Sequence, residues 1–222
     1  MRSLAFATGV MAWIVAAPSL AQEVPTASDL LFEMRDWQAV PLDATLLYRY
    51  ERVSGLASER TRGFSDTIRL LVKPGAVVDA RNVQVEMFPS TRRQPAGPFN
   101  DVMGNPVLVL FLEQHLQTLA AALGANPRYL RNAIRTGLRE KVSVTPIITT
   151  YQTGSVPAWR IETQPFSEDT HSSRMQGLDT LKYSFVTSER IPGRILSIDV
   201  KAVAADGRTL LQEVLSYDPS GS

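Results

Sequence analysis

Two stretches of the chain alternate between apolar and polar residues with a period of two, which is typical of half-buried β-strands. The first stretch contains three predicted strands, at 45–53, 64–73 and 81–88. The second contains five, at 142–151, 158–166, 181–188, 194–203 and 209–217. Turn signals such as Asp206–Gly207 separate neighbouring strands, so we predict antiparallel hairpins.

Helical patterns interrupt the strands in the middle of the chain. Asn105–Pro106 and Asn126–Pro127 each place an Asn N-cap before a Pro at the first helical position. We predict one helix that ends at Gly124, a second that runs to about Glu140, and a short N-terminal helix that is capped by Ser28 and runs to about Trp37. The expected fold is therefore α+β: a curved antiparallel sheet of about eight strands with a central helical hairpin packed on it.

The first residues have the three-part pattern of a secretory signal. Arg2 precedes an apolar stretch, Leu4–Ala17, and Pro18 is followed by the small residues of Ser19–Leu20–Ala21. The apolar stretch is too short to cross roughly 30 Å of hydrocarbon as a helix, which disfavours a membrane anchor. We predict a signal peptide at residues 1–21, a single α+β domain at 22–222 with no transmembrane span, and a periplasmic or secreted protein.

Charge and cysteine content narrow the range of functions. The chain has 23 Lys and Arg against 22 Asp and Glu, and loss of residues 1–21 removes only Arg2, so the mature chain balances. Zero net charge and export disfavour nucleic acid as a partner. With no cysteine, the chain forms no disulfide and performs no thiol chemistry.

No motif for nucleophilic, nucleotide-dependent or metal-dependent catalysis occurs, so we assign no catalytic residue and expect neither a cofactor nor a metal. Asp66 lies on the apolar face of a predicted strand, where we expect a structural ion pair with an arginine. His115 is expected to be buried and hydrogen-bonded in a helix. A hydrolase-type site around Asp66, Glu113 and His115 is the enzymatic alternative. Glu168, Asp169 and His171 match no known metal-ligand spacing and predict an exposed loop.

Two features point to a ligand. The first central helix opens with apolar residues on every side, and a helix over a curved sheet can enclose an apolar pocket or a closed core. The residues that would line such a pocket are Tyr48, Tyr50, Val107, Val109, Leu110 and Phe111. The second helix carries Arg128, Arg131, Arg135 and Arg139 within about 80° of one another. This strip would face lipid headgroups or an acidic partner, or else be an ordinary solvated surface.

Two resemblances add to this picture. The segments NPVLVLFLE (105–113) and YLRNAIR (129–135) resemble a group of uncharacterised exported proteobacterial proteins, which implies no activity. The order of elements is similar to the periplasmic lipoprotein-carrier half-barrels, in which a sheet and a helical lid enclose acyl chains. We therefore expect an exported, non-enzymatic protein that binds an apolar or amphipathic ligand, such as a lipid, or an envelope-assembly partner. A purely structural periplasmic protein and the hydrolase are the alternatives.

Overall fold

One antiparallel sheet of nine strands forms the framework of the protein, in the order β4-β3-β2-β1-β9-β8-β7-β6-β5. The computed structural model describes residues 24–33, 40–56, 58–78 and 80–221, so the predicted signal peptide and the predicted helical residues Met34 and Trp37 lie outside the described residues. The strands are β1 (Thr45–Ser54), β2 (Phe64–Pro74), β3 (Arg81–Met87), β4 (Phe99–Val102), β5 (Val142–Tyr151), β6 (Gly154–Thr163), β7 (Lys182–Thr187), β8 (Ile195–Val203) and β9 (Thr209–Asp218). The α+β prediction is confirmed, with a helix pair packed on the sheet.

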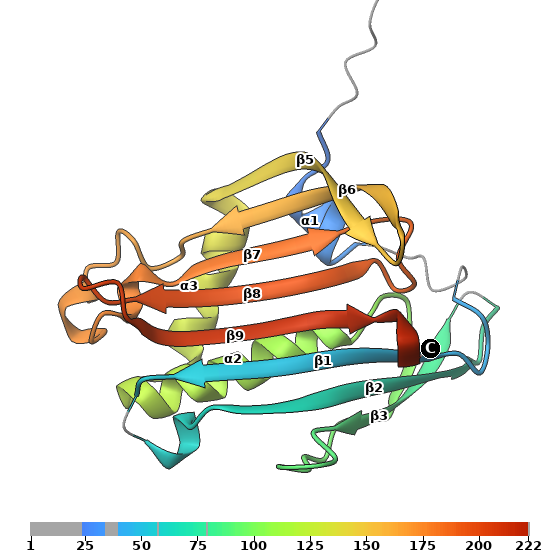
Figure 1. Cartoon of the computed structure of the whole chain (residues 1–222), viewed down its shortest axis with the longest axis horizontal. Helices are drawn as coiled ribbons and strands as arrows, with labels where there is room; N and C mark the ends of the chain where they lie inside the picture. Colours follow the sequence, from blue (N-terminus) through green and yellow to red (C-terminus); the bar gives the residue numbers. More distant parts are fainter. Residues whose placement is uncertain (1–23, 34–39, 57, 79, 222) are drawn as a thin grey trace, which may run out of the picture.

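The sheet consists of two meanders that meet where β1 pairs with β9 (Figure 1). Every strand pair is antiparallel, as the hairpin signals predict. The register of the central pair places Tyr50 opposite Leu215 and Arg52 opposite Glu213. Residues far apart in the sequence are thereby brought side by side in the middle of the sheet.

Two strand predictions are corrected. No strand is predicted between 81–88 and the first central helix, but the structure has β4 there, which pairs with β3 only at Val102 and Phe99 and is too short for an alternating pattern. β6 begins at Gly154 rather than at residue 158, and pairs with β5 from there. Pro157 is tolerated because the pairing between β6 and β7 begins only at Trp159, so β6 is an edge strand at that point.

Within the described ranges, three α-helices accompany the sheet: α1 (Ala27–Leu31), α2 (Val107–Leu123) and α3 (Pro127–Glu140). Short 3-10 turns are η2 (Glu59–Thr61), η3 (Ser172–Arg174), η4 (Leu178–Thr180) and η5 (Pro219–Gly221). α2 ends at Gly124, whose φ of 60° is the left-handed conformation that favours glycine. The predicted cap of α1 is wrong: Thr26, not Ser28, caps it, in a reciprocal capping box with Asp29.

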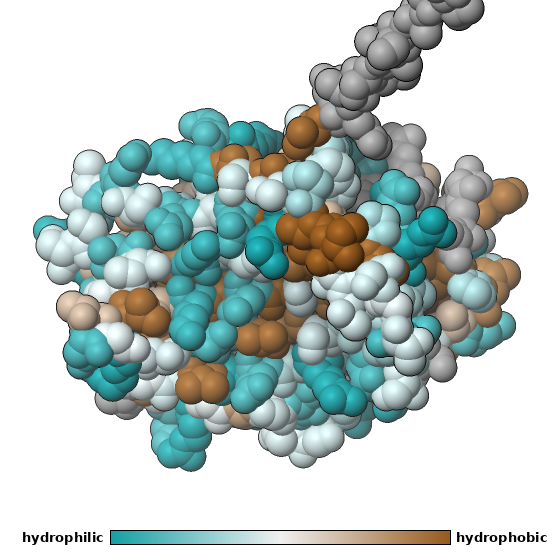
Figure 2. Space-filling view, turned by 45° about the horizontal axis from the view of Figure 1, so that its top comes forward, coloured by the Kyte–Doolittle hydropathy of each residue, from teal (hydrophilic) through white to brown (hydrophobic). Residues whose placement is uncertain are grey.

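The helices cover one face of the sheet and leave the other open. α2 runs along the strands behind β9 and β1, whereas α3 runs across the strands and leads into β5 at the far edge (Figure 1). Gly137 lets α3 approach the segment after β6, because a Cβ there would lie 2.7 Å from Cβ of Pro165. The open face carries polar side chains such as the Arg69–Glu86 ion pair. In the oblique view, hydrophilic residues surround a hydrophobic patch (Figure 2).

Candidate functional site

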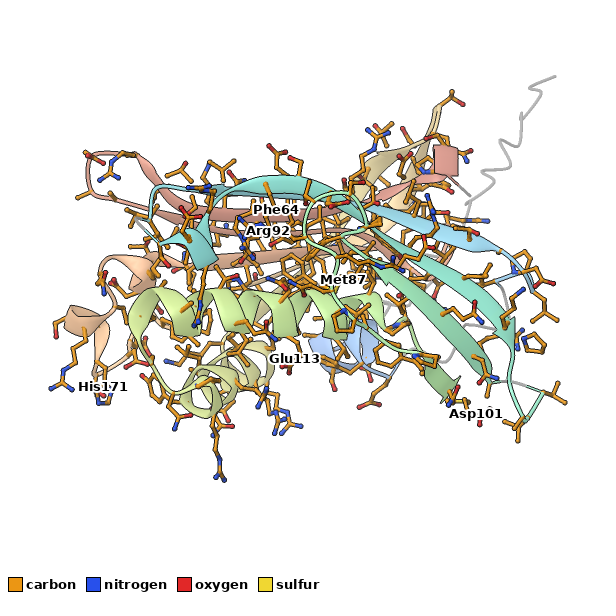
Figure 3. All side chains as sticks on the ribbon, turned by 90° about the horizontal axis from the view of Figure 1, so that it is seen from below. Phe64, Met87, Arg92, Asp101, Glu113 and His171 are labelled. Atoms are coloured by element: carbon orange, nitrogen blue, oxygen red, sulfur yellow. The ribbon has the colours of Figure 1, made fainter. Side chains whose placement is uncertain are left out.

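The space between α2 and the sheet is filled by the hydrophobic core. Tyr48, Tyr50, Val107, Leu110 and Phe111, which the sequence analysis gave as lining a pocket or a closed core, are all buried there. Phe64 and Met87 also lie between sheet and helix (Figure 3). The geometry at these residues is thus the closed core, and any ligand site implied by the carrier resemblance would have to lie elsewhere.

A network of polar groups crosses this core at Glu213 of β9. Oε1 of Glu213 accepts hydrogen bonds from Nε and Nη2 of Arg52, at 2.9 and 2.8 Å, and from the hydroxyl of Tyr50. Oε2 contacts Nδ1 of His115, and Nε2 of the same ring lies 2.7 Å from the hydroxyl of Tyr183. The network therefore joins β1, β7, β9 and α2, and the prediction of a buried, hydrogen-bonded His115 is confirmed.

The electrostatics of the network keep Glu213 ionised. Burial alone would raise the pKa of its carboxyl, but His115, Arg52 and the Tyr50 hydroxyl together lower that pKa below its ordinary value. Burial raises the pKa of Tyr183 well above its usual value. Glu213, His115 and Tyr183 are completely buried, so these groups reach no solvent and hold strands and helix together.

The three residues of the enzymatic alternative are not brought together. The carboxylate of Asp66 accepts hydrogen bonds from the backbone N–H groups of Ser90 and Thr91, so the expected arginine partner is wrong. Glu113 lies on the side of α2 away from the sheet (Figure 3), whereas His115 bonds to the sheet. Three separate environments therefore replace the convergent site that a hydrolase needs.

The loop after β6 gathers exposed polar groups rather than metal ligands. The carboxylate of Asp169 accepts hydrogen bonds from the hydroxyl of Tyr129 and from the backbone N–H of His171, and Glu168 pairs with Lys141. The His171 side chain is exposed, as predicted, at the end of the molecule remote from Glu113 (Figure 3). Among the described residues no cluster of three or more His, Asp or Glu side chains could hold a metal ion.

A groove of about 560 Å³ lies between α1, α2 and α3, on the side of α2 that faces away from the sheet. Its lining residues are Ser28, Phe32, Glu33, Val109, Leu112, Glu113, Leu116, Arg131, Ile134, Arg135, Leu138 and Arg139. Leu116, Ile134 and Leu138 are buried and form an apolar floor. Charged residues stand around this floor, so the groove combines the two surface types of an amphipathic ligand.

Only three of the four arginines of the predicted strip line this groove. Arg131, Arg135 and Arg139 line it, and Arg128 does not. The guanidinium of Arg131 forms a two-pronged ion pair with Glu113, at 2.9 to 3.2 Å. Arg135 and Arg139 have no hydrogen-bond or ion-pair partner within the described part of the chain. Two arginines without an ion-pair partner among the described residues therefore stand beside an apolar floor, and the carboxylate of Glu33 lines the same groove.

Sequence reasoning found the arginines and missed the groove. The helical spacing of the arginines is visible in the sequence, but Phe32 and Glu33 of the third wall follow a helix of only five residues. Val109, which the sequence analysis placed with the pocket-lining residues, is 51% exposed and lines the groove instead of the core. An apolar residue at a helical position that faces away from the sheet is a signal that could have marked Val109 as part of a surface groove.

Comparison with family models and with curated proteins gives no further guide to this groove. No family model matches the chain. A comparison with curated proteins likewise finds no match. Of the helices in the described ranges, none combines the length and the apolar character needed to traverse a bilayer. The geometry of the groove is therefore the evidence for function.

Proposed function

We propose that the protein is a non-enzymatic binder of an amphipathic ligand with a negatively charged headgroup, and that the ligand lies in the groove between α1, α2 and α3. The observation that carries the proposal is a pair of arginines beside the apolar floor, Arg135 and Arg139, which have no partner within the described ranges. The predicted periplasmic or secreted location is part of the proposal.

Charge and polarity at the groove favour this ligand class. Guanidinium groups bind carboxylates and phosphates through short, charge-assisted hydrogen bonds. The floor of Leu116, Ile134 and Leu138 would cover methylene groups, at roughly 0.8 kcal/mol for each one buried. A volume of about 560 Å³ also falls within the range of small-molecule sites. A free monomeric amphiphile, rather than a membrane surface, is the ligand that a groove of this size admits.

Binding of dodecanoate tests the proposal. Isothermal titration should show that the mature chain binds dodecanoate, and that it binds dodecyltrimethylammonium, which has the same chain and the opposite charge, at least about tenfold more weakly. Replacing Arg135 and Arg139 together by Gln should weaken dodecanoate binding by about tenfold or more, if each charge contributes about 1 kcal/mol. The unfolding temperature should be unchanged, because neither side chain has a partner to lose among the residues that the structure describes.

Arg128→Gln is the matched control, since Arg128 lies on the same helix and does not line the groove. It should leave dodecanoate binding unaltered. Equal effects of the control and the double variant would reject the assigned headgroup site. A chain that ignores monomeric dodecanoate but floats with phosphatidylglycerol vesicles would be a membrane-surface protein, contrary to the proposal.

A further inference from the structure

A second hollow of about 260 Å³ lies next to the groove, at the N-terminal end of α2. It is bounded by β4, by the loop that leads into α2, and by the turn that leads into β8 together with the first residue of that strand. Its walls are largely apolar: Leu31, Phe32, Phe99, Val102, Met103, Pro106, Leu108, Val109 and Ile195 line it, together with Gly104, Asn105, Gly193 and Arg194. The proposed headgroup site does not use this hollow.

The two hollows meet at Phe32 and Val109, because both residues line both of them. These two apolar side chains are 52% and 51% exposed, although each has apolar hollows on either side. An aliphatic chain lying across them would cover both side chains and would continue from one hollow into the other. From Pro106 to Leu116, the combined path follows α2 for about 15 Å, at 1.5 Å per residue.

Charge gives this path a direction. Arg135 and Arg139, which lack partners among the described residues, stand at the α3 end. At the other end, Val102, Met103 and Ile195 offer apolar contacts to a chain terminus. The one cation among the residues that line the second hollow, Arg194, is already paired with Glu189, at 3.6 Å. A headgroup at α3 therefore leaves the tail pointing toward β4.

We infer that the ligand is a long, single-chain anionic amphiphile whose tail passes between Phe32 and Val109 and ends in the second hollow. This inference rests on the proposed function and adds a tail site that selects for chain length. Phe32 and Val109 are the residues that the middle of the chain contacts, and Val102 and Met103 are those that its end contacts.

Affinity as a function of chain length tests the tail site. Stearate should bind at least about tenfold more tightly than octanoate, because only the longer chain reaches the second hollow. Val102→Trp, which fills that hollow, should remove most of this gain and leave octanoate binding within about twofold of the wild type. Val53→Trp is the matched control, since Val53 is an exposed valine of β1 and lines neither hollow. Met103→Trp should repeat the effect if Val102→Trp does not fold.

Nitroxide-labelled stearate locates the tail in the unaltered protein. A nitroxide at the methyl end should broaden the NMR signals of Met103 and Ile195, and one at the carboxyl end should broaden those of Ile134 and Leu138. The reverse pattern, or equal affinities for octanoate and stearate, would overturn the tail site and leave the arginine site standing. Failure of every carboxylate to bind would instead overturn the proposed function.

Discussion

The two sides of α2 treat charge in opposite ways. On the side facing the sheet, the carboxylate of Glu213 meets Arg52, Tyr50 and His115, and the ring of His115 also meets Tyr183. On the far side, the groove has an apolar floor and two arginines that no described residue neutralises. The same helix therefore has two different sides. We call the side facing the sheet saturated, because its charges are paired, and the groove side unsaturated, because Arg135 and Arg139 have no partner among the described residues.

This difference separates structural groups from binding groups. A buried charge must be paired, because an unpaired one costs several kcal/mol. The network around Glu213 therefore stabilises the fold, and its charged groups are not available to bind a ligand. A partly exposed guanidinium can stand unpaired at little cost, because water solvates it until an anion arrives. Histidine and glutamate in contact thus mark the core here, and unpaired arginine marks the site.

The largest expected effect is on the saturated side. Glu213→Gln leaves the Arg52 guanidinium buried without a counter-charge, so the free energy of unfolding should fall by about 3–5 kcal/mol. Urea denaturation followed by circular dichroism measures this. The folded fraction of the variant should still bind dodecanoate, because the network and the groove lie on opposite sides of α2.

Glu51→Gln is the control for this change, since Glu51 is an exposed residue of the neighbouring strand β1 and should change stability by less than about 0.5 kcal/mol. Equal stability of the two variants would show that the network is not structural. A stable Glu213→Gln protein that has lost ligand binding would place the ligand at the network.

Asp66 should show a milder form of the same effect. Its carboxylate accepts hydrogen bonds from the backbone N–H and hydroxyl of Thr91, both at 2.7 Å, and from the backbone N–H of Thr67 at 2.8 Å. Burial alone would raise the pKa of this carboxyl, but these hydrogen bonds lower it below its ordinary value. Asp66→Asn should therefore lower the free energy of unfolding by about 1–2 kcal/mol at pH 7.

The free energy that Asp66 contributes to folding should depend on pH in a defined direction. Because the folded-state pKa of Asp66 is lowered, its contribution is fully present above the unfolded pKa of about 3.9 and is lost as the pH falls through the folded value. The stability gap between the wild type and Asp66→Asn should thus narrow between pH 5 and pH 3, in urea titrations at each pH. A gap that stays constant would mean that the carboxylate charge contributes nothing.

The fold was predictable where a local signal fixes it. Alternation and the two Asn–Pro pairs predict most strands and both long helices, because these patterns are set by nearest neighbours along the chain. The predicted cap is confirmed for α3, where Asn126 precedes Pro127, but α2 begins one residue later than predicted, at Val107 with Pro106 as its N-cap. The β4 strand escaped because its four residues are held by pairing with β3 and carry no period of their own. The Thr26 cap was missed in favour of Ser28, although Asp29 three residues after Thr26 completes a capping box.

The candidate site was predictable only in part. The arginine strip follows from helical spacing, and the burial of His115 follows from its apolar neighbours on α2. No local pattern in the sequence shows which carboxylate pairs with which cation. Glu113 neutralises Arg131 of the strip, and Glu213 contacts Arg52 only because β1 pairs with β9. Such contacts depend on register and helix crossing, which the sequence does not display.

The smallest expected effect concerns Arg131, and it tests whether this residue belongs to the anion-binding site on the unsaturated side of α2. Its guanidinium is neutralised by Glu113, in an ion pair whose side chains are about half exposed. Glu113→Gln should free this third positive charge beside Arg135 and Arg139. Dodecanoate binding should then tighten by about two- to fivefold, the equivalent of about 0.4–1 kcal/mol, while the unfolding temperature stays nearly constant because an exposed pair contributes little to stability.

The salt dependence of dodecanoate binding distinguishes an electrostatic gain in Glu113→Gln from a change in the shape of the groove. The gain should vanish near 1 M salt, where charges are screened over about 3 Å, and Glu51→Gln should produce no gain at any salt concentration. Weaker binding by Glu113→Gln would mean that the carboxylate contacts the ligand itself. Unchanged binding would place the headgroup beyond Arg131, nearer Arg139. In either case the unsaturated side would be narrower than three arginines, and the ion pair would belong with the saturated groups that hold α2 and α3 together.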